Sequence, residues 1–252
     1  MKKKLGQNFL RNAEISEKII ELSKFENDID IIEIGPGDGA LTDILVEKYK
    51  NLCLLEYDSD LIVPLKNRYK KYNINIINDD ARTYKINTKS SVNVIGNLPY
   101  YASNIIIRNF MAQDKVKSMV FTVQKEVGEQ IVAGPGKKSF LSLFIQSFCD
   151  VEKLLIIKNK EFYPIPKVDS MTVKITPRNN KIDNEYVDFL KKGFSNPRKK
   201  ISNSLSMGLK LNSNEVKTLL NLSNVEENLR PQHLNLDEWK LLFKNHKNYD
   251  QI

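Results

Sequence analysis

The chain has 252 residues, of which 41% are hydrophobic and 28% charged, and its formal net charge at pH 7 is +8. This composition is typical of a soluble globular protein, and no uninterrupted apolar run approaches the roughly 20 residues of a membrane span. Met1 is followed by lysines and polar residues rather than by the apolar core of a signal peptide, so we expect a cytoplasmic protein with no membrane association. The positive charge favours a polyanionic partner, and nucleic acid is the first to consider.

The chain contains two cysteines and two histidines. Cys53 and Cys149 each lie in an apolar segment, which indicates buried free thiols rather than a disulfide framework. So few ligands do not predict a metal site built from His and Cys side chains.

A basic segment precedes the first expected helix. Residues 2–12 combine three lysines with Gln7 and Asn8, and a basic tip of this kind is most often a solvated terminus. Asn12 can cap a helix that begins directly after it, because its side chain can accept from the free amides of the first turn. Four apolar residues at helical spacing then form one face: Ile15, Ile19, Ile20 and Leu22.

A strand running into a glycine-rich turn occupies residues 31–39, and a helix is expected directly after it. The turn contains Gly35 and Gly37, and taken alone it is also compatible with a plain tight turn. The second strand, Leu52–Leu55, ends in Glu56, about 20 residues beyond the glycines. An acidic residue there can hydrogen-bond the ribose hydroxyls of a nucleotide-like cofactor, so the two signals together are far more specific than either one.

Two further features concern the charge of that cofactor. The turn has no Gly-Lys-Ser or Gly-Lys-Thr sequence, so it is not a P-loop. Glu33 lies two residues before Gly35, and an acidic residue suits a cofactor with a positive charge better than a pyrophosphate. S-adenosylmethionine is a cofactor of that kind.

The next two expected strands also end in polar residues. Ile74–Asn78 is followed by Asp79, Asp80 and Ala81, and these carboxylates can bind an adenine amine. Val92–Gly96 is an apolar run typical of a buried parallel strand, and the polar residues begin directly after it. In open α/β sheets, ligands bind at the carboxyl ends of the strands.

The four residues after this strand are Asn97, Leu98, Pro99 and Tyr100. Pro99 stiffens the backbone and favours an extended Leu98. The side-chain oxygen of Asn97 and the carbonyl of Leu98 can accept the two hydrogens of an exocyclic amine while Tyr100 stacks on the base. The same residues are also compatible with a tight turn after a strand, because short motifs carry a real risk of false positives.

Strands continue to alternate with helices, which predicts an α/β fold with a doubly wound, Rossmann-like sheet. The glycine-containing segment 134–138 is expected to be a mobile basic loop that carries Lys137 and Lys138. Phe162 lies in a loop between the last two expected strands. The remaining elements are helices near 104–112, 124–132 and 140–148 and strands at 118–123, 151–158 and 171–176.

The composition changes after Pro177, where a polar linker leads into short helices at 185–194, 199–209, 213–220 and 236–244. We therefore expect one domain over residues 1–180 and a small helical domain over residues 181–252. The helix expected near residue 199 opens with Arg198, Lys199 and Lys200. These three residues either bind phosphates or form a solvated face.

Together these motifs resemble, in identity and order, those of the ribosomal RNA adenine N6,N6-dimethyltransferases. The resemblance covers essentially the full length, and the combination is much more specific than any single motif. It is carried by residues 7–10, 33–37, Glu56, 80–81, 97–100, 124–127, 162–170 and 230–231.

The resemblance implies a class I methyltransferase domain with an S-adenosylmethionine pocket, in which Glu56 binds the ribose and Asp80 the adenine amine. It implies that the target adenine is flipped out and held between Tyr100 and Phe162. Asn97 to Tyr100 and Phe162 are then the catalytic residues. The cofactor-binding residues are Gln7, Asn8, Leu10, Gly35, Gly37, Glu56, Asp80, Ala81 and Asn97.

The implied reaction is dimethylation of two adjacent adenosines in a hairpin near the 3′ end of small-subunit rRNA, with an assembling 30S particle as the partner of a monomeric enzyme. RNA contacts are expected from the basic residues at 137–138 and 198–200. The alternatives are a related macrolide-resistance methyltransferase acting on large-subunit rRNA and a non-catalytic RNA- or DNA-binding factor on the same fold. The chain departs from the commonest family pattern at Asp38 and Tyr101, where an apolar residue and an asparagine are usual.

Overall fold

The computed structural model describes residues 8–178 and 181–249, and in it the chain divides into two compact units. The first falls within Met1–Glu129 and Asp150–Arg178, and the second within Gln130–Cys149 and Asn179–Ile252. The sequence suggested one boundary near residue 180. The structure differs in that the segment 130–149 also belongs with the helices at the end of the chain.

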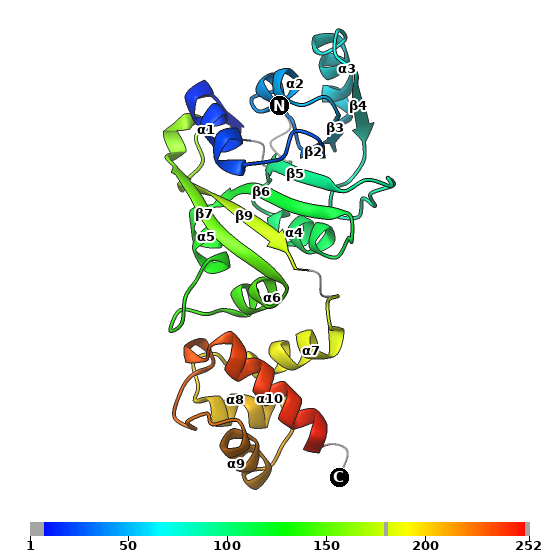
Figure 1. The fold of residues 1–252 in the computed structure, drawn as a ribbon. Helices are drawn as coiled ribbons and strands as arrows, with labels where there is room; N and C mark the ends of the chain where they lie inside the picture. The colour runs from blue at the N-terminus through cyan, green and yellow to red at the C-terminus, as the bar shows by residue number, and fades with distance from the viewer. Residues whose placement is uncertain (1–7, 179–180, 250–252) are drawn as a thin grey trace. The chain divides into compact units, whose positions relative to one another are not determined.

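Within the described residues, the first unit contains a seven-stranded sheet with the order β4-β3-β2-β5-β6-β9-β7 (Figure 1). β2 to β6 run parallel, and β9 pairs antiparallel with β6. The predicted α/β class is therefore confirmed. The strands are β2 (Asp30–Ile34), β3 (Leu52–Glu56), β4 (Ile74–Asn78), β5 (Val92–Asn97), β6 (Val116–Gln124), β7 (Cys149–Ile157) and β9 (Ser170–Pro177).

Helices cover both faces of this sheet (Figure 1). Buried residues of α1, α2 and α3 share one apolar cluster with alternate residues of the strands, such as Ile31 and Leu54. Asn12 caps α1 as predicted, by accepting from the Ile15 amide at 3.3 Å. The helices are α1 (Ala13–Ser23), α2 (Thr42–Lys48), α3 (Ser59–Arg68), α4 (Ser103–Met111) and α5 (Lys125–Ile131).

A small antiparallel sheet joins two distant parts of the first unit. β1 (Phe9–Leu10) pairs with β8 (Phe162–Tyr163), and the 3-10 helix η2 (Asn159–Glu161) precedes β8. The side-chain amide of Asn12 donates to the Glu161 carboxylate at 2.9 Å, which fixes the same junction. The residues before α1 are thereby placed beside the loop that contains Phe162.

The second unit is helical and is organised around aromatic side chains. Tyr186 contacts Phe148 and Phe243 at ring-centroid distances of 6.3 and 5.3 Å, and Trp239 is fully buried. These contacts explain why the segment 130–149 belongs here: α6 supplies Phe148 to the cluster. The helices are α6 (Phe140–Phe148), α7 (Asn184–Gly193), α8 (Ile201–Leu209), α9 (Ser213–Leu222), η3 (Pro231–His233) and α10 (Leu236–Tyr249).

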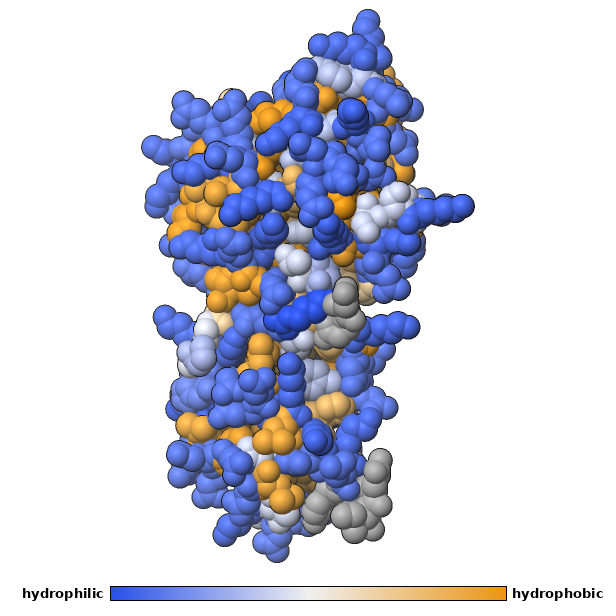
Figure 2. Space-filling view, in the orientation of Figure 1, coloured by the Kyte–Doolittle hydropathy of each residue, from blue (hydrophilic) through white to orange (hydrophobic). Residues whose placement is uncertain are grey.

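Charged and polar residues cover most of the face shown in Figure 2, and hydrophobic residues appear there as separate patches. None of the helices in the described part of the chain is long and apolar enough to cross a membrane. Both cysteines are free thiols; Cys149 is buried and Cys53 is partly buried.

Candidate active site

A pocket lies at the carboxyl ends of β2, β3, β4 and β5, where the sequence predicted a ligand site. The space between its lining atoms, open solvent included, amounts to about 1150 Å³. The predicted residues that line it are Asn8, Leu10, Gly35, Gly37, Glu56, Asp80, Ala81, Asn97, Leu98, Pro99, Tyr100 and Phe162. Gln7, the remaining cofactor prediction, lies outside the described residues.

The glycine-rich turn leaves one wall of the pocket open. Gly35 and Gly37 have φ values of +62° and +59°, a backbone conformation that favours glycine. A Cβ on Gly35 would have only the Asn97 carbonyl oxygen near it, at 4.0 Å, so the missing side chain leaves room for a ligand. A Cβ on Gly37 would lie 2.8 Å from the Phe9 ring, so this glycine lets β1 approach the turn.

Glu56 ends β3 inside the pocket and is only 4% exposed. Its carboxylate accepts from the backbone amides of Gly37 at 3.3 Å and Asp58 at 2.8 Å. Burial raises the pKa of this carboxyl group, and the two hydrogen bonds oppose that shift. A carboxylate held in this way at the end of β3 suits the ribose hydroxyls of a nucleoside.

Glu33 is more deeply buried than the charge argument from the sequence assumed. Burial raises its pKa to about 8, although the Thr42 hydroxyl donates to it at 2.7 Å and lowers the pKa in part. Most Glu33 side chains are therefore protonated at pH 7. The residue fixes the start of α2 through Thr42, and does not supply the full negative charge inferred from its position before the glycines.

Asp80 follows β4 and is bound by a neighbouring arginine. The Arg82 Nε donates to both Asp80 oxygens at 2.9 Å, and the pair lowers the pKa of Asp80. The guanidinium carbon also lies 5.7 Å from the centre of the Tyr57 ring. Asp80 is thus at the predicted place, but Arg82, which the sequence did not single out, competes for its oxygens.

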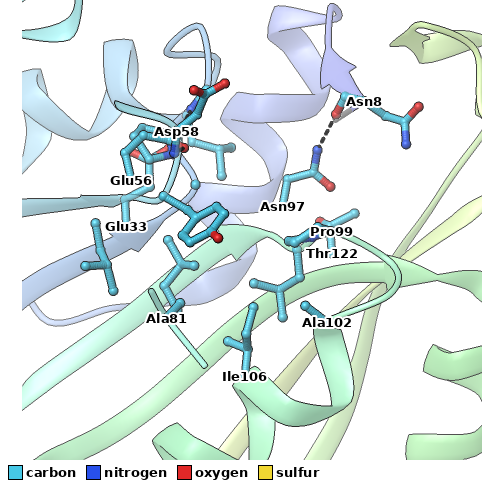
Figure 3. A pocket seen from close by; sticks show the side chains of 18 of the residues that line it. Asn8, Glu33, Glu56, Asp58, Ala81, Asn97, Pro99, Ala102, Ile106 and Thr122 are labelled. Carbon is cyan, nitrogen blue, oxygen red and sulfur yellow. Dashed lines mark hydrogen bonds between the residues drawn. The ribbon is translucent and has the colours of Figure 1, made fainter. Parts of the chain in front are cut away.

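Asn97 is the last residue of β5 and its orientation is fixed. Its side-chain nitrogen donates to the Asn8 carbonyl oxygen at 2.8 Å (Figure 3). In the same view, Glu33 and Glu56 lie on one side of the pocket and Asn97 and Pro99 on the other (Figure 3). Because Asn8 accepts from the side-chain nitrogen of Asn97, the side-chain oxygen lies on the other branch of the amide. That oxygen can accept a hydrogen bond from a ligand.

The residues after Asn97 are held by β6 and β9. The Leu98 amide donates to the Thr122 carbonyl at 3.0 Å, and the Leu98 side chain is 2% exposed. The Tyr100 hydroxyl and Ser170 Oγ share a hydrogen bond of 2.9 Å, and burial raises the pKa of Tyr100. Ser170 therefore fixes the tyrosine ring. It is the last residue of the 162–170 motif, but no pattern in the sequence indicates this contact.

Phe162 lines the pocket from β8 and pairs in register with Leu10. Its side chain is only 2% exposed and belongs to the apolar cluster beneath α1. The ring therefore forms part of the pocket wall, and its contact with a flipped-out base stays a prediction.

Asp38 forms an ion pair with Arg11 at 2.5 Å. The guanidinium carbon of Arg11 also lies 5.6 Å from the centre of the Phe9 ring. Asp38 thereby connects the glycine-rich turn to the segment that contains Asn8. A basic partner so far away in the sequence could not be assigned from the motif alone.

The predicted RNA-binding residues all lie in the second unit, outside this pocket. Lys137, Arg198, Lys199 and Lys200 are exposed. Lys138 corrects the prediction: it is 8% exposed and its ammonium group donates to the Gln146 side chain, so it is a buried residue and not a surface contact.

The helix expected to begin at residue 199 begins at Ile201. Arg198, Lys199 and Lys200 therefore precede α8 instead of lying on its first turn, and Lys200 is its N-cap residue. Within residues 8–178 and 181–249, no three His, Cys, Asp or Glu side chains are placed to share a metal ion.

The sequence matches the family model described as ribosomal RNA adenine dimethylase over residues 1–246. A protein from Mycoplasma mobile is 36% identical over 96% of this chain and 96% of its own, and one from Clostridium acetobutylicum is 34% identical over 94% and 90%. Both are named ribosomal RNA small subunit methyltransferase A.

Two solved structures share the fold. A dimethyladenosine transferase from Plasmodium falciparum has a TM-score of 0.81 and 25% identity, covering 96% of this chain and 98% of its own. The 23S rRNA methyltransferase ErmE has a TM-score of 0.78 and 22% identity, covering 94% and 99%, which shows the fold alone. From the family match and these relatives, we conclude that the chain belongs to the ribosomal RNA adenine dimethylase family and is an S-adenosylmethionine-dependent methyltransferase.

Proposed function

We propose that this enzyme dimethylates the N6 amines of two adjacent adenosines near the 3′ end of small-subunit rRNA. The orientation of Asn97 carries the proposal, because the hydrogen bond to Asn8 leaves an acceptor oxygen beside Leu98 and Tyr100. The names of relatives 33–37% identical to this chain support the small subunit as the target. We further propose that it acts in the cytoplasm, as a monomer, on an assembling 30S particle.

The pocket fits S-adenosylmethionine in three respects: room beside Gly35, a carboxylate from Glu56 for the ribose, and Asp80 for the adenine amine. When bound, the cofactor supplies a methyl group on a positively charged sulfonium. Arg82 engages Asp80 and must share or release one carboxylate oxygen for an adenine amine to bind there.

The contribution of the protein is mainly to orient a poor nucleophile. The lone pair of an adenine amine is delocalised into the ring, so the amine has to be held with both hydrogens engaged. Asn97 Oδ1 and the Leu98 carbonyl are the two acceptors, and Tyr100 stacks on the base. No strong general base is needed, because the nitrogen becomes cationic after transfer and releases its proton to water.

Phe162 completes the target site from the other side. It is a wall residue at 2% exposure, and we expect it to contact the target base. Replacing Phe162 with Ala should therefore lower turnover, and a variant with unchanged turnover would remove it from the site.

The subunit specificity is tested by mapping methylated adenosines by mass spectrometry after incubation with each undermethylated ribosomal subunit. Modification of two adjacent adenosines in the small subunit supports the proposal. Modification of the large subunit would assign the enzyme to the macrolide-resistance type, whose fold it shares. No modification of either subunit, in a protein that binds the cofactor, would favour a non-catalytic assembly or transcription factor.

The second unit is proposed to dock on the RNA, since the pocket distinguishes a base but not its position in the ribosome. Lys137, Arg198, Lys199 and Lys200 are exposed cations of this unit and suit phosphate contacts. Lys200 also donates to the Asn228 side chain at 2.5 Å, which holds the basic segment against the following loop.

Charge reversal of Arg198, Lys199 and Lys200 should weaken particle binding and reduce the salt dependence of that binding, because fewer counterions are displaced from phosphate. Cofactor affinity should not change. The matched control reverses three exposed lysines of the first unit: Lys50, Lys66 and Lys70. If both triple variants weaken binding equally, the effect is one of net charge and the segment 198–200 is not a docking element.

A further inference from the structure

Two consecutive tyrosines at the pocket have opposite environments. The Tyr100 ring is partly buried and its hydroxyl is held by Ser170. Tyr101 lines the same pocket but is 56% exposed. Tyr101 therefore lies at the mouth of the pocket, with much of its ring in contact with solvent.

The exposed apolar surface continues from Tyr101 onto α4. Ile105, on the first turn of α4, is 53% exposed, whereas Ala102 and Ile106 are buried. Tyr101 precedes α4 by two residues, so both side chains are exposed apolar groups at the amino-terminal end of this helix. They lie beside the catalytic segment, and we refer to these two residues as the mouth platform.

Arg82 places a positive charge at the same mouth. It lines the pocket, and its side chain is 38% exposed. A guanidinium group has five N–H donors, and Asp80 accepts from those on Nε and Nη2. Donors on Nη1 therefore remain for a further anion near Tyr101.

An RNA strand suits this surface better than a protein partner. One tyrosine, one isoleucine and one arginine offer far less than the roughly 800 Å² per partner of a stable protein interface. Unpaired RNA, in contrast, is bound by stacking bases on aromatic rings and by pairing phosphates with arginine. An adenosine in the pocket is joined to its neighbour by one phosphate, so that neighbour has to lie close to the mouth.

We propose that the mouth platform binds the nucleotide next to the adenosine in the pocket, with its base stacked on Tyr101 against Ile105 and its phosphate near Arg82. This inference rests on the proposed function, which supplies the RNA substrate. For a pair of adjacent adenosines, the platform holds one while the other is methylated.

The test is a thermodynamic cycle in which a substitution at Tyr101 is combined with removal of one base from the RNA. Small-subunit particles are assembled with rRNA that carries either adenosine or an abasic nucleotide next to the target, and binding of the full-length enzyme is measured with S-adenosylhomocysteine present. Removing the base should weaken binding by wild-type enzyme about tenfold. Tyr101→Ala should weaken binding to the intact particle to a similar extent and show no further loss with the abasic particle.

Tyr101→Phe keeps the ring and should retain wild-type binding, which separates stacking from loss of the hydroxyl. Ile105→Ala should reduce the loss of binding that removal of the neighbouring base causes. Its matched control is Val63→Ala, because Val63 is 64% exposed on α3 and does not line the pocket. Val63→Ala should leave the effect of the missing base unchanged.

Additive effects of Tyr101→Ala and base removal would overturn the proposal, because they would show that the ring and the base do not interact. Wild-type enzyme is tested in parallel for dimethylation of the intact particle. If the particle is methylated and the cycle is additive, only the mouth platform is refuted. If the particle is not methylated, the proposed function fails, and the platform proposal fails with it.

Discussion

Asn97 combines two tasks in one amide group. Its nitrogen binds the segment before α1 through Asn8, and its oxygen is the proposed acceptor for the target amine. Asn97→Ala should therefore lower the rate of methyl transfer by at least about 100-fold while weakening cofactor binding only modestly. Single-turnover assays and isothermal titration measure the two effects separately.

Asn97→Asp is the informative comparison, because it keeps the acceptor oxygens but loses the donor to Asn8. It should retain more activity than the alanine variant. If titration shows that either variant has lost cofactor binding altogether, Asn97 serves mainly the cofactor and not the target base.

Glu33 makes the stability of the fold depend on pH. Its pKa is about 8 in the folded protein and near the ordinary value of 4.5 when unfolded, so its contribution is fully present below about pH 4.5 and is lost as the pH rises through 8. Glu33→Gln stays neutral and can still accept from Thr42. The variant should therefore gain stability relative to wild type between pH 5 and 8, by roughly a few kcal/mol.

Calorimetric melting of both proteins across this pH range provides the check. Taking the difference between the two melting temperatures removes the contribution of other groups, including Glu56, whose pKa is also raised. A difference that stays constant from pH 5 to 8 would show that Glu33 ionises normally in the folded protein.

The place of some single residues could be predicted from the sequence, whereas most of their contacts could not. Glu56 and Asn97 could be placed in the pocket because parallel strands end at a common edge, and that rule needs only the strand boundaries. The contact of Asn97 with Asn8 spans 89 positions, and burial of Lys138 depends on Gln146 in another element. Such contacts are set by tertiary packing, which neither motif spacing nor hydropathy encodes.

At the level of elements, Gly96 determines how closely two central strands approach. A Cβ there would lie 2.5 Å from the Ile34 carbonyl oxygen, on a strand that cannot move without disturbing β3. Gly96→Ala should cost at least about 2 kcal/mol of unfolding free energy and should widen the pocket at Asn97. Urea denaturation measures the loss.

Gly134→Ala is the matched control, because a Cβ at Gly134 would meet no atom within 4 Å. Its free energy of unfolding should stay within about 0.5 kcal/mol of wild type. Equal stabilities of the two variants would mean that β2 and β5 can adjust to an added methyl group.

Strands of the sheet were easier to predict than its helices. Every strand from β2 to β7, and β9, was expected within a few residues of its observed position, because buried parallel strands are short apolar runs. α3 was not predicted, since Pro64 interrupts its helical pattern. The pairing of β1 with β8 was also missed, because two-residue strands carry no periodicity.

At the scale of the whole molecule, the division into units changes where the chain can be cut. A shortened chain that ends at Arg178 keeps the segment 130–149 but loses the helices that cover it. The apolar residues of α6, among them Phe144 and Phe148, would then be exposed. This chain should aggregate and bind the dye ANS strongly.

Replacing residues 130–149 of that shortened chain with a short Gly-Ser linker should remove the exposed surface. Since every residue that lines the pocket lies outside 130–149 and before 178, the resulting protein should still bind S-adenosylmethionine but fail to methylate a small-subunit particle. Equal solubility with and without residues 130–149 would contradict the assignment of α6 to the second unit. Full activity on the particle would contradict the docking role.

Because the second unit combines the segment 130–149 with residues from 179 onward, its first helix is synthesised well before the helices that it packs against. α6 leaves the ribosome about 100 residues before α10 is complete, a delay of about 5–20 s at typical translation rates. During that time Phe148 has neither Tyr186 nor the later aromatic residues to pack against. The nascent chain therefore presents a bare apolar helix while β7 to β9 and the later helices of the second unit are being made, and chaperones that bind exposed apolar helices can bind it in this interval.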